Sequence, residues 1–209
     1  MIDIDQDEEQ SNNCIKVILV GDTGTGKTNL ISVAAGRKFK AVNLITTTCS
    51  FFPLKINIDG KEYQINLWDT IGQEKYQSIT KIFFKHSKIV LYVYDITNRK
   101  SFDNLKNWKQ IIDETLGEVP IIGVVGNKCD LFLQEEIKEK EGKNYADEIG
   151  AKLLYTSAKL DAKNFREFVE GLAKDYVIKY GIKSNNDIKL NKKKHAEKNE
   201  QKDKKCCKS

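Results

Sequence analysis

The feature that most constrains the fold is the segment over residues 21–28, which reads GDTGTGKT and satisfies the pattern GxxxxGK(S/T). The apolar stretch 15–20 before it is typical of a buried strand, and residues 27–36 after it are typical of a short helix. Glycines in such a loop let backbone N–H groups converge on phosphate oxygens, and the N-terminus of the following helix adds its dipole. An ordinary glycine-rich turn is the alternative, which the strand before the motif and the helix after it disfavour.

This loop predicts a site for a nucleoside phosphate and Mg²⁺. The Lys27 ammonium is expected to neutralise the β- and γ-phosphates, and the Thr28 hydroxyl is expected to ligate Mg²⁺. The residues expected to contact phosphate are Asp22, Thr23, Gly24, Thr25, Gly26, Lys27 and Thr28.

Strand and helix patterns alternate along the rest of the chain. The expected strands cover residues 15–20, 51–58, 62–68, 88–94, 121–125 and 152–155. The expected helices cover residues 27–36, 101–116, 143–149 and 165–180. Asp59-Gly60 indicates a hairpin between the second and third strands, and Pro53 places the second strand at a sheet edge. The pattern predicts an α/β fold of the P-loop NTPase type: a six-stranded, mostly parallel sheet with one antiparallel edge strand and helices on both faces.

Three further polar motifs follow expected strands, and the carboxyl ends of strands in an open α/β sheet share one crevice. After the third strand, Asp69 suits the water shell of Mg²⁺, Gly72 offers a backbone N–H to a γ-phosphate, and Gln73 is suited to orienting an attacking water. Asp130, in the later motif NKCD, is able to accept two N–H bonds from the edge of guanine, whereas adenine presents a different pattern. The third motif is TSAK at 156–159. Taken alone, the first two motifs are compatible with polar turns, so their weight comes from the phosphate loop upstream.

Several of these segments resemble the Ras superfamily of small GTPases and, within it, the Rab branch. They are WDT at 68–70, GQE at 72–74, KYQSIT at 75–80, YVYDIT at 92–97, NKCDL at 127–131 and TSAK at 156–159. The resemblance covers residues 14–180. It implies a GTP-binding G domain that holds GTP or GDP with Mg²⁺ and hydrolyses GTP slowly.

The resemblance also implies roles for individual residues. Thr46 would ligate Mg²⁺ together with Thr28, and Asp69 would support the ion through a water. Gln73 would be the catalytic residue. The residues that would hold the guanine base are Phe39, Asn127, Lys128, Asp130, Ser157, Ala158 and Lys159. The aromatic residues that match a surface triad for effectors, with a place in the core as the equal alternative, are Phe51, Trp68 and Phe83.

Three departures from the family pattern leave a second function open. Ile71 stands where the family has alanine beside the γ-phosphate, and the stretch 47–51 (TTCSF) lacks a glycine and an acid. Thr23 is bulky at a position that an incoming arginine would approach. The alternative is therefore a GTP-binding module that does not cycle because its hydrolysis is impaired. A P-loop kinase or ATPase is a third candidate, but it gives no reason for NKCD or for two cysteines near the end.

The two ends of the chain differ in charge from the domain between them. Residues 1–13 carry five acids and no base, whereas residues 184–209 carry nine lysines and four acids in a polar, aperiodic stretch. We therefore expect an acidic extension over 1–13, a G domain over 14–180 and a disordered Lys-rich tail over 181–209. Cys206 and Cys207 resemble the double cysteine that carries prenyl groups in Rab-like proteins, the alternative being a solvated tail with two incidental cysteines.

Composition excludes some classes of protein, and the resemblance supplies the expected location and partners. No apolar run approaches the roughly 18 residues of a membrane span, the first ten residues contain no apolar leader, and the five cysteines form no CxxC pair. The resemblance to the Rab branch implies a monomer on the cytoplasmic face of an intracellular membrane, with a cytosolic pool, that regulates vesicle trafficking. The partners that the same resemblance implies are an exchange factor, an activating protein, effectors and a prenyl-binding escort protein. Nucleic acid is not expected, because the basic tail has no aromatic residue to stack on bases.

Overall fold

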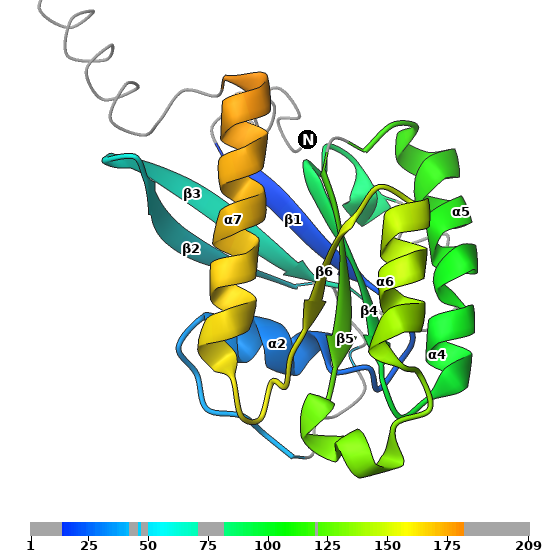
Figure 1. Ribbon diagram of the computed structural model, residues 1–209. Helices are drawn as coiled ribbons and strands as arrows, with labels where there is room; N and C mark the ends of the chain where they lie inside the picture. Colours follow the sequence, from blue (N-terminus) through cyan, green and yellow to red (C-terminus); the bar gives the residue numbers. More distant parts are fainter. Residues whose placement is uncertain (1–13, 42–45, 47–49, 71–81, 120, 182–209) are drawn as a thin grey trace, which may run out of the picture.

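The computed structural model describes residues 14–41, 46, 50–70, 82–119 and 121–181. Within these residues six strands form one sheet, in the order β2-β3-β1-β4-β5-β6 (Figure 1). The strands are β1 (Cys14–Val20), β2 (Ser50–Ile58), β3 (Lys61–Asp69), β4 (Ile89–Asp95), β5 (Ile121–Asn127) and β6 (Lys152–Tyr155). β2 and β3 are antiparallel and the other neighbouring pairs are parallel, which confirms the predicted sheet.

Helices lie on both faces of this sheet, as the sequence predicts (Figure 1). They are α2 (Lys27–Ala34), α4 (Arg99–Asp103), α5 (Leu105–Leu116), α6 (Glu139–Glu148), α7 (Ala162–Tyr180) and the 3₁₀ helix η2 (Cys129–Gln134). The buried side chains of α2 and α7 belong to one core cluster, and those of α5 and α6 belong to another. The sheet therefore separates two hydrophobic cores, and the polar motifs lie in the loops that follow the ends of its strands.

The central strands are buried on both faces, which explains their unbroken apolar runs. In β1, Val17 and Leu19 belong to the core under α2 and α7, whereas Ile18 and Val20 belong to the core under α5 and α6. All four side chains are completely shielded from solvent. Because burial of such a side chain stabilises the fold by about 1.5–3 kcal/mol, this strand anchors both cores and fixes where the loop after it begins.

The hairpin of β2 and β3 forms where the sequence predicts it. Asp59 and Gly60, the two residues of its turn, both have positive φ angles of 49° and 82°, which a two-residue turn between twisted strands requires. Pro53 lies in β2, the strand at the edge of the sheet, where a residue without a backbone N–H is tolerated. The edge position predicted from Pro53 is therefore confirmed.

The boundaries of several helices differ from the prediction, because polar side chains fix their first turns. The single helix predicted over 101–116 is wrong: α4 and α5 are separate and meet at Asn104. α4 starts earlier because the Asn98 side chain accepts a hydrogen bond from the Ser101 N–H, and Asp161 caps α7 in the same way. α6 begins four residues before its predicted start, and η2 was not predicted at all.

Gly21, at the end of β1, provides a test of how tightly the loop packs on β4. It has φ = 147°, and a Cβ atom there would lie 2.1 Å from the Val93 carbonyl oxygen. We expect Gly21→Ala to lower the free energy of unfolding by about 3 kcal/mol or more, measured by chemical denaturation. Gly171→Ala in α7, where a Cβ would meet nothing within 4 Å, is the control and should raise stability by about 0.5–1 kcal/mol. Equal stability of the two variants would contradict this packing.

Candidate nucleotide-binding site

The carboxyl ends of the parallel strands border a cavity of about 470 Å³, a volume in the range of small-molecule sites. The residues predicted from sequence that line it are Thr23, Gly24, Gly26, Lys27, Thr28, Phe39, Thr46, Asn127, Lys128, Asp130, Ser157, Ala158 and Lys159. Asn29, Ala41, Thr70 and Leu131 also line it: Thr70 and Leu131 lie in the segments WDT and NKCDL but had no predicted role, and Asn29 and Ala41 lie in no motif. The structure thus brings the phosphate loop and both later motifs together at one edge of the sheet, as open α/β sheets do.

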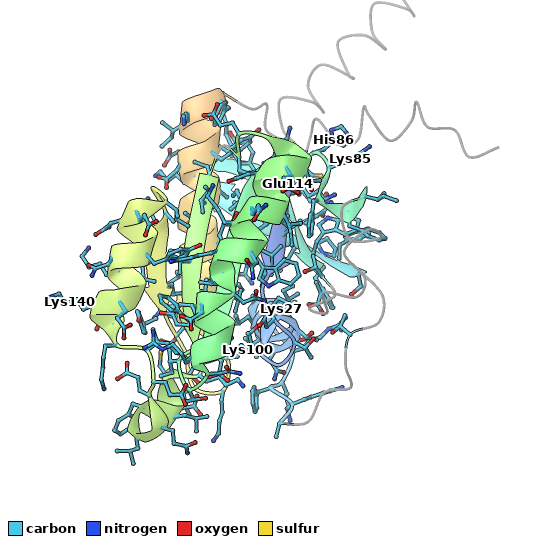
Figure 2. The ribbon with its side chains drawn as sticks, turned by 90° about the vertical axis from the view of Figure 1, so that its right-hand side faces the viewer. Lys27, Lys85, His86, Lys100, Glu114 and Lys140 are labelled. Carbon is cyan, nitrogen blue, oxygen red and sulfur yellow. The ribbon has the colours of Figure 1, made fainter. Side chains whose placement is uncertain are left out.

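Lys27 places a buried positive charge at the phosphate loop. Its ammonium donates to the carbonyl oxygens of Gly21 at 2.7 Å and Asp22 at 2.8 Å, and the residue is only 6% exposed. Lys85, Lys100 and Lys140 are by contrast exposed, and Figure 2 shows Lys85 and Lys140 at the outline of the molecule. Burial lowers the pKa of Lys27 to about 8, the charges of Asp69 and Asp22 opposing that shift. The negative charge of a polyphosphate would stabilise the protonated form.

Side-chain oxygen atoms from α2, from β3 and from Thr46, which lies between them in the sequence, meet beside Lys27. The Thr28 hydroxyl donates to Asp69 Oδ2 at 2.7 Å, and it lies 3.0 Å from the Thr46 hydroxyl oxygen. Asp69 Oδ1 is buried and has no hydrogen-bond partner among the described residues. Burial raises the pKa of this carboxyl group above its ordinary value. Hydroxyl and carboxylate oxygens are the ligands that Mg²⁺ prefers, so this set fits the ion, with the unpartnered Oδ1 able to accept from one of its waters.

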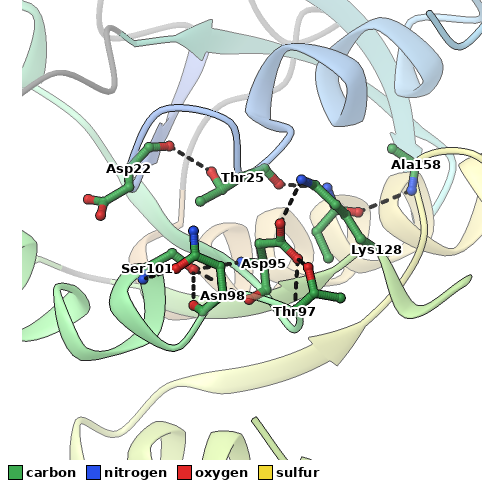
Figure 3. A network of polar contacts seen from close by, with 9 residues as sticks. Asp22, Thr25, Asp95, Thr97, Asn98, Ser101, Lys128 and Ala158 are labelled. Carbon is green, nitrogen blue, oxygen red and sulfur yellow. Dashed lines mark hydrogen bonds and ion pairs between the residues drawn. The ribbon is translucent and has the colours of Figure 1, made fainter. Parts of the chain in front are cut away.

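Asn127 joins the phosphate loop to the loop that follows β6. Its side-chain Nδ2 donates to the Thr25 carbonyl oxygen at 2.8 Å, and its Oδ1 accepts from the Ala158 N–H at 3.1 Å (Figure 3). The residue is 1% exposed, so both bonds are shielded from water. A Cβ at Gly26 would lie 2.3 Å from Nδ2, which explains why this loop position is a glycine. The Asn127 amide therefore positions the two loops that border the cavity.

Asp130 presents a fixed carboxylate to the cavity. The Ser157 hydroxyl donates to its Oδ1 at 2.6 Å, and the Lys159 ammonium lies 3.8 Å from its Oδ2. The Ser157 oxygen in turn accepts from the backbone N–H groups of Lys159 and Leu160, each at 3.2 Å. These contacts hold the carboxylate in one orientation and leave it lone pairs for two N–H donors of a ligand.

Lys128 is held by Asp95, which lies in the segment YVYDIT but was given no role from the sequence. Its ammonium lies 2.6 Å from Asp95 Oδ2, while Asp95 Oδ1 accepts from the Thr97 N–H at 2.9 Å and the Thr97 hydroxyl at 2.7 Å (Figure 3). Asp95 is the last residue of β4, so the rule that picked out Asp69, an acid at the carboxyl end of a strand, would also have found it. The ion pair fixes the Lys128 side chain at the cavity wall.

Asp22 and Phe39 reach the site in different ways. The Asp22 carboxylate Oδ1 accepts from the Trp108 indole at 2.9 Å and from the Asn104 amide at 2.5 Å, so it is directed to α5. Any contact of this residue with phosphate is therefore left to its backbone. Phe39 is half-buried against the core under α2 and α7 while it also lines the cavity, a position that suits an aromatic wall for a base.

The three aromatic residues that match an effector triad form a stack at the surface. The rings of Phe51 and Trp68 stack with centroids 5.1 Å apart, and those of Trp68 and Phe83 are 6.1 Å apart. Phe51 is 50% exposed, and the other two are half-buried. Lys16 adds a cation 4.4 Å from the Trp68 ring. Both alternatives hold in part: Phe51 lies at the surface, whereas Trp68 also packs against the core under α5 and α6.

Some predicted residues lie outside the described residues: Ile71, Gly72, Gln73, Cys206 and Cys207, with both chain ends. Within the described ranges, no helix is long and apolar enough to cross a membrane. The same part of the chain contains no cluster of three or more His, Cys, Asp or Glu residues suited to a metal.

Comparison with known proteins gives a single family. The Ras family matches residues 16–177. The chain is 39% identical to the Ras-related protein Rab-21 of Geodia cydonium over 76% of this chain and 69% of that one. It is 37% identical to human Rab-8B over 81% and 82% of the two chains, and 33% identical to bovine Rab-13 over 90% and 96%. Together with the glycine-rich loop, the Asp130 carboxylate at the cavity and the sheet order, these matches establish that the chain belongs to the Ras family of small GTPases, in its Rab branch.

Proposed function

We propose that this Rab-like GTPase is a switch that binds GTP or GDP with Mg²⁺, hydrolyses GTP slowly and presents two conformations to partner proteins. The observation that supports the proposal most directly is that three features meet at one cavity. They are a buried lysine, a set of oxygen atoms that fits Mg²⁺, and an oriented carboxylate. The lysine and the oxygen set suit a triphosphate, and the carboxylate suits the N–H edge of guanine.

The chain's own residues account for most of the chemistry. Lys27 would neutralise the β- and γ-phosphates, and Thr28 and Thr46, whose hydroxyl groups meet beside Asp69, would hold Mg²⁺, with Asp69 acting through a water. When bound, the ion neutralises charge that builds up on the phosphate oxygens. Gln73 orients a water for attack on the γ-phosphorus, and the bond to the oxygen bridging the β- and γ-phosphates breaks, which leaves GDP and phosphate.

Hydrolysis changes the protein because two contacts end with the γ-phosphate. In the proposed GTP state Thr46 would help to hold Mg²⁺ beside this group, and Gly72 would donate its backbone N–H to it. Without it, both segments relax, and the neighbouring stack of Phe51, Trp68 and Phe83 is the surface on which effectors would distinguish the two states. Hydrolysis then serves as a timer for the signal.

Slow intrinsic hydrolysis is expected because no arginine of this chain is available to the phosphates. Arg99 pairs with Glu141 at 2.8 Å, and Arg166 contacts Glu170 at 2.9 Å. Arg37 lies over the Phe52 ring. The sequence contains no fourth arginine. An arginine supplied by an activating protein is worth about 10³–10⁵ in rate, so the proposed cycle depends on such a partner and on an exchange factor.

We also propose that the basic tail attaches the switch to the cytoplasmic surface of a membrane that takes part in vesicle trafficking. Prenyl groups on Cys206 and Cys207, together with nine lysines over residues 184–209, would combine hydrophobic anchoring with attraction to anionic lipids. A prenyl-binding escort protein would maintain a cytosolic pool. Residues 1–13 form a separate acidic extension in this proposal.

Single-turnover hydrolysis tests the switch. The protein is loaded with GTP and Mg²⁺, and formation of GDP is followed for the native chain and Gln73→Leu. We expect the native chain to convert GTP at about 10⁻⁴ s⁻¹, with Gln73 orienting the water and no arginine assisting. In the variant we expect conversion to be lost. Gln110→Leu, an exposed position on α5, is the control and should hydrolyse GTP like the native chain.

The opposite result would select the second candidate. If neither the native chain nor Gln73→Leu converts tightly held GTP, the protein is a binding module that does not cycle. Ile71 beside the γ-phosphate and the altered stretch 47–51 favour that candidate.

A further inference from the structure

We propose that Asn29 is a latch that holds the segment after α2 against the bound nucleotide and slows nucleotide release. The inference rests on the proposed function, because it concerns the same cavity. Asn29 follows Thr28 in α2, and its side-chain Nδ2 donates to the Lys40 carbonyl oxygen at 2.9 Å. The Lys40 N–H in turn donates to Asn29 Oδ1 at 3.3 Å. One amide thus binds both backbone polar groups of a residue eleven positions away.

The latch acts on a segment with little other support. Residues 37–41 belong to no helix or strand, although they pass along the cavity after α2. Among the described residues, the two bonds from Asn29 are the hydrogen bonds that tie residues 38–41 to the rest of the domain. Arg37 is held separately, through its N–H to the Ser32 carbonyl oxygen at 2.9 Å. The position of residues 38–41 therefore depends on Asn29 and on the packing of Phe39.

The clamped residue lies between two residues of the cavity wall. Phe39 and Ala41 line the cavity, whereas the side chain of Lys40 between them is exposed. A backbone fixed at Lys40 limits how far its two neighbours can move, so the latch holds Phe39 in place at the cavity. Since Asn29 itself lines the cavity beside Thr28, it links the phosphate end of the site to the aromatic wall.

We expect loss of the two Asn29 bonds to change the rate of nucleotide release but not the rate of nucleotide association. Breaking the latch leaves Lys27, Thr28 and Asp130 with all their contacts, so phosphates and base are still recognised on arrival. What changes is how long residues 38–41, with Phe39 at the cavity, stay in place beside the bound nucleotide. An exchange factor that lifts residue 40 would have to break the same two bonds.

Release of a fluorescent GDP analogue tests the latch. The full-length protein is loaded with the analogue and Mg²⁺, and dissociation is followed after addition of excess unlabelled GDP. We expect Asn29→Ala to release the analogue roughly tenfold faster, a change equal to about 1.4 kcal/mol, with an association rate constant within about twofold of the native value. Asn57→Ala is the matched control, because Asn57 accepts from the Gly60 N–H at 2.9 Å in the hairpin turn, away from the cavity. Its release rate should equal that of the native chain.

A double-mutant cycle with Phe39→Ala asks whether Asn29 acts through the aromatic wall. If it does, Asn29→Ala has little further effect on release once Phe39 is replaced, because residues acting as a unit are not additive. An unchanged release rate in Asn29→Ala, equal acceleration in Asn57→Ala, or the same factor with and without Phe39 would overturn the proposal. Failure of the nucleotide-binding part of the proposed function looks different, since the native protein itself would then not bind the GDP analogue; failure of hydrolysis alone leaves this test unaffected, because the test uses GDP.

Discussion

Asp130→Asn is expected to change the base preference of the cavity from guanine to xanthine. The Asp130 carboxylate offers acceptors to both N–H groups on one edge of guanine, whereas an amide offers one acceptor and one donor. Xanthine carries a carbonyl in place of the guanine amino group, so its edge matches the amide. The Ser157 hydroxyl, which donates to Oδ1 at 2.6 Å, would keep the amide oxygen on its side and so fix the orientation. We expect GDP affinity to fall about a hundredfold, since a charged hydrogen bond is lost and a donor is left unpaired, and XDP affinity to rise.

Displacement of a fluorescent GDP analogue by unlabelled GDP and XDP measures this change. Asp161→Asn is the matched control: Asp161 caps α7 through the Asn164 N–H at 3.1 Å, and asparagine caps a helix equally well. That variant should keep the native preference for GDP. If Asp130→Asn also keeps it, the carboxylate does not recognise the base, and the guanine half of the proposed function is wrong.

The fold could be predicted because the hydrophobic pattern of this chain is unambiguous. The apolar runs of β1 and β4 need two covered faces, and two covered faces in an alternating chain mean a parallel sheet with helices on both sides. Helix starts were predicted poorly, because they depend on a single bond such as that from the Ser101 N–H to Asn98. No periodicity of apolar residues carries that information.

The sequence predicted those site residues whose role follows from the motif in which they lie. The lining role of Lys27, Thr28 and Asp130 follows from their motifs, which place them at the carboxyl ends of strands or on the helix that follows. Contacts between motifs do not follow: the Asn127 amide meets the Thr25 carbonyl across 102 positions, and only the packed sheet brings them together. Asn29 was missed for the same reason, since nothing in its own helix points to the backbone of Lys40.

Lys27→Met is expected to abolish tight nucleotide binding while making the nucleotide-free protein more stable. A unit charge about 4 Å from a phosphate oxygen contributes roughly 4 kcal/mol in a partly shielded site, so GTP affinity should fall about a thousandfold. In the free protein, by contrast, the ammonium is a buried charge that lowers stability, and methionine fills a similar volume without it. Equilibrium binding of the fluorescent GDP analogue and urea denaturation of the nucleotide-free protein measure the two effects. Lys100→Met, at an exposed position, is the control and should change neither.

The pH dependence of that stability difference identifies its cause. Burial lowers the pKa of Lys27 from 10.5 to about 8, so between those pH values the unfolded chain binds more protons than the folded one. The stability of the nucleotide-free native protein therefore rises with pH through this window, whereas below pH 8 this group adds no slope. The difference between the two pKa values corresponds to about 3 kcal/mol. This is the largest gain in unfolding free energy that Lys27→Met can obtain near pH 7 from removal of the buried charge. The advantage should shrink steadily as the pH is raised from 8 to 9.5. An advantage that stays constant over that range would mean that the extra stability comes from packing of the methionine and not from removal of a buried charge.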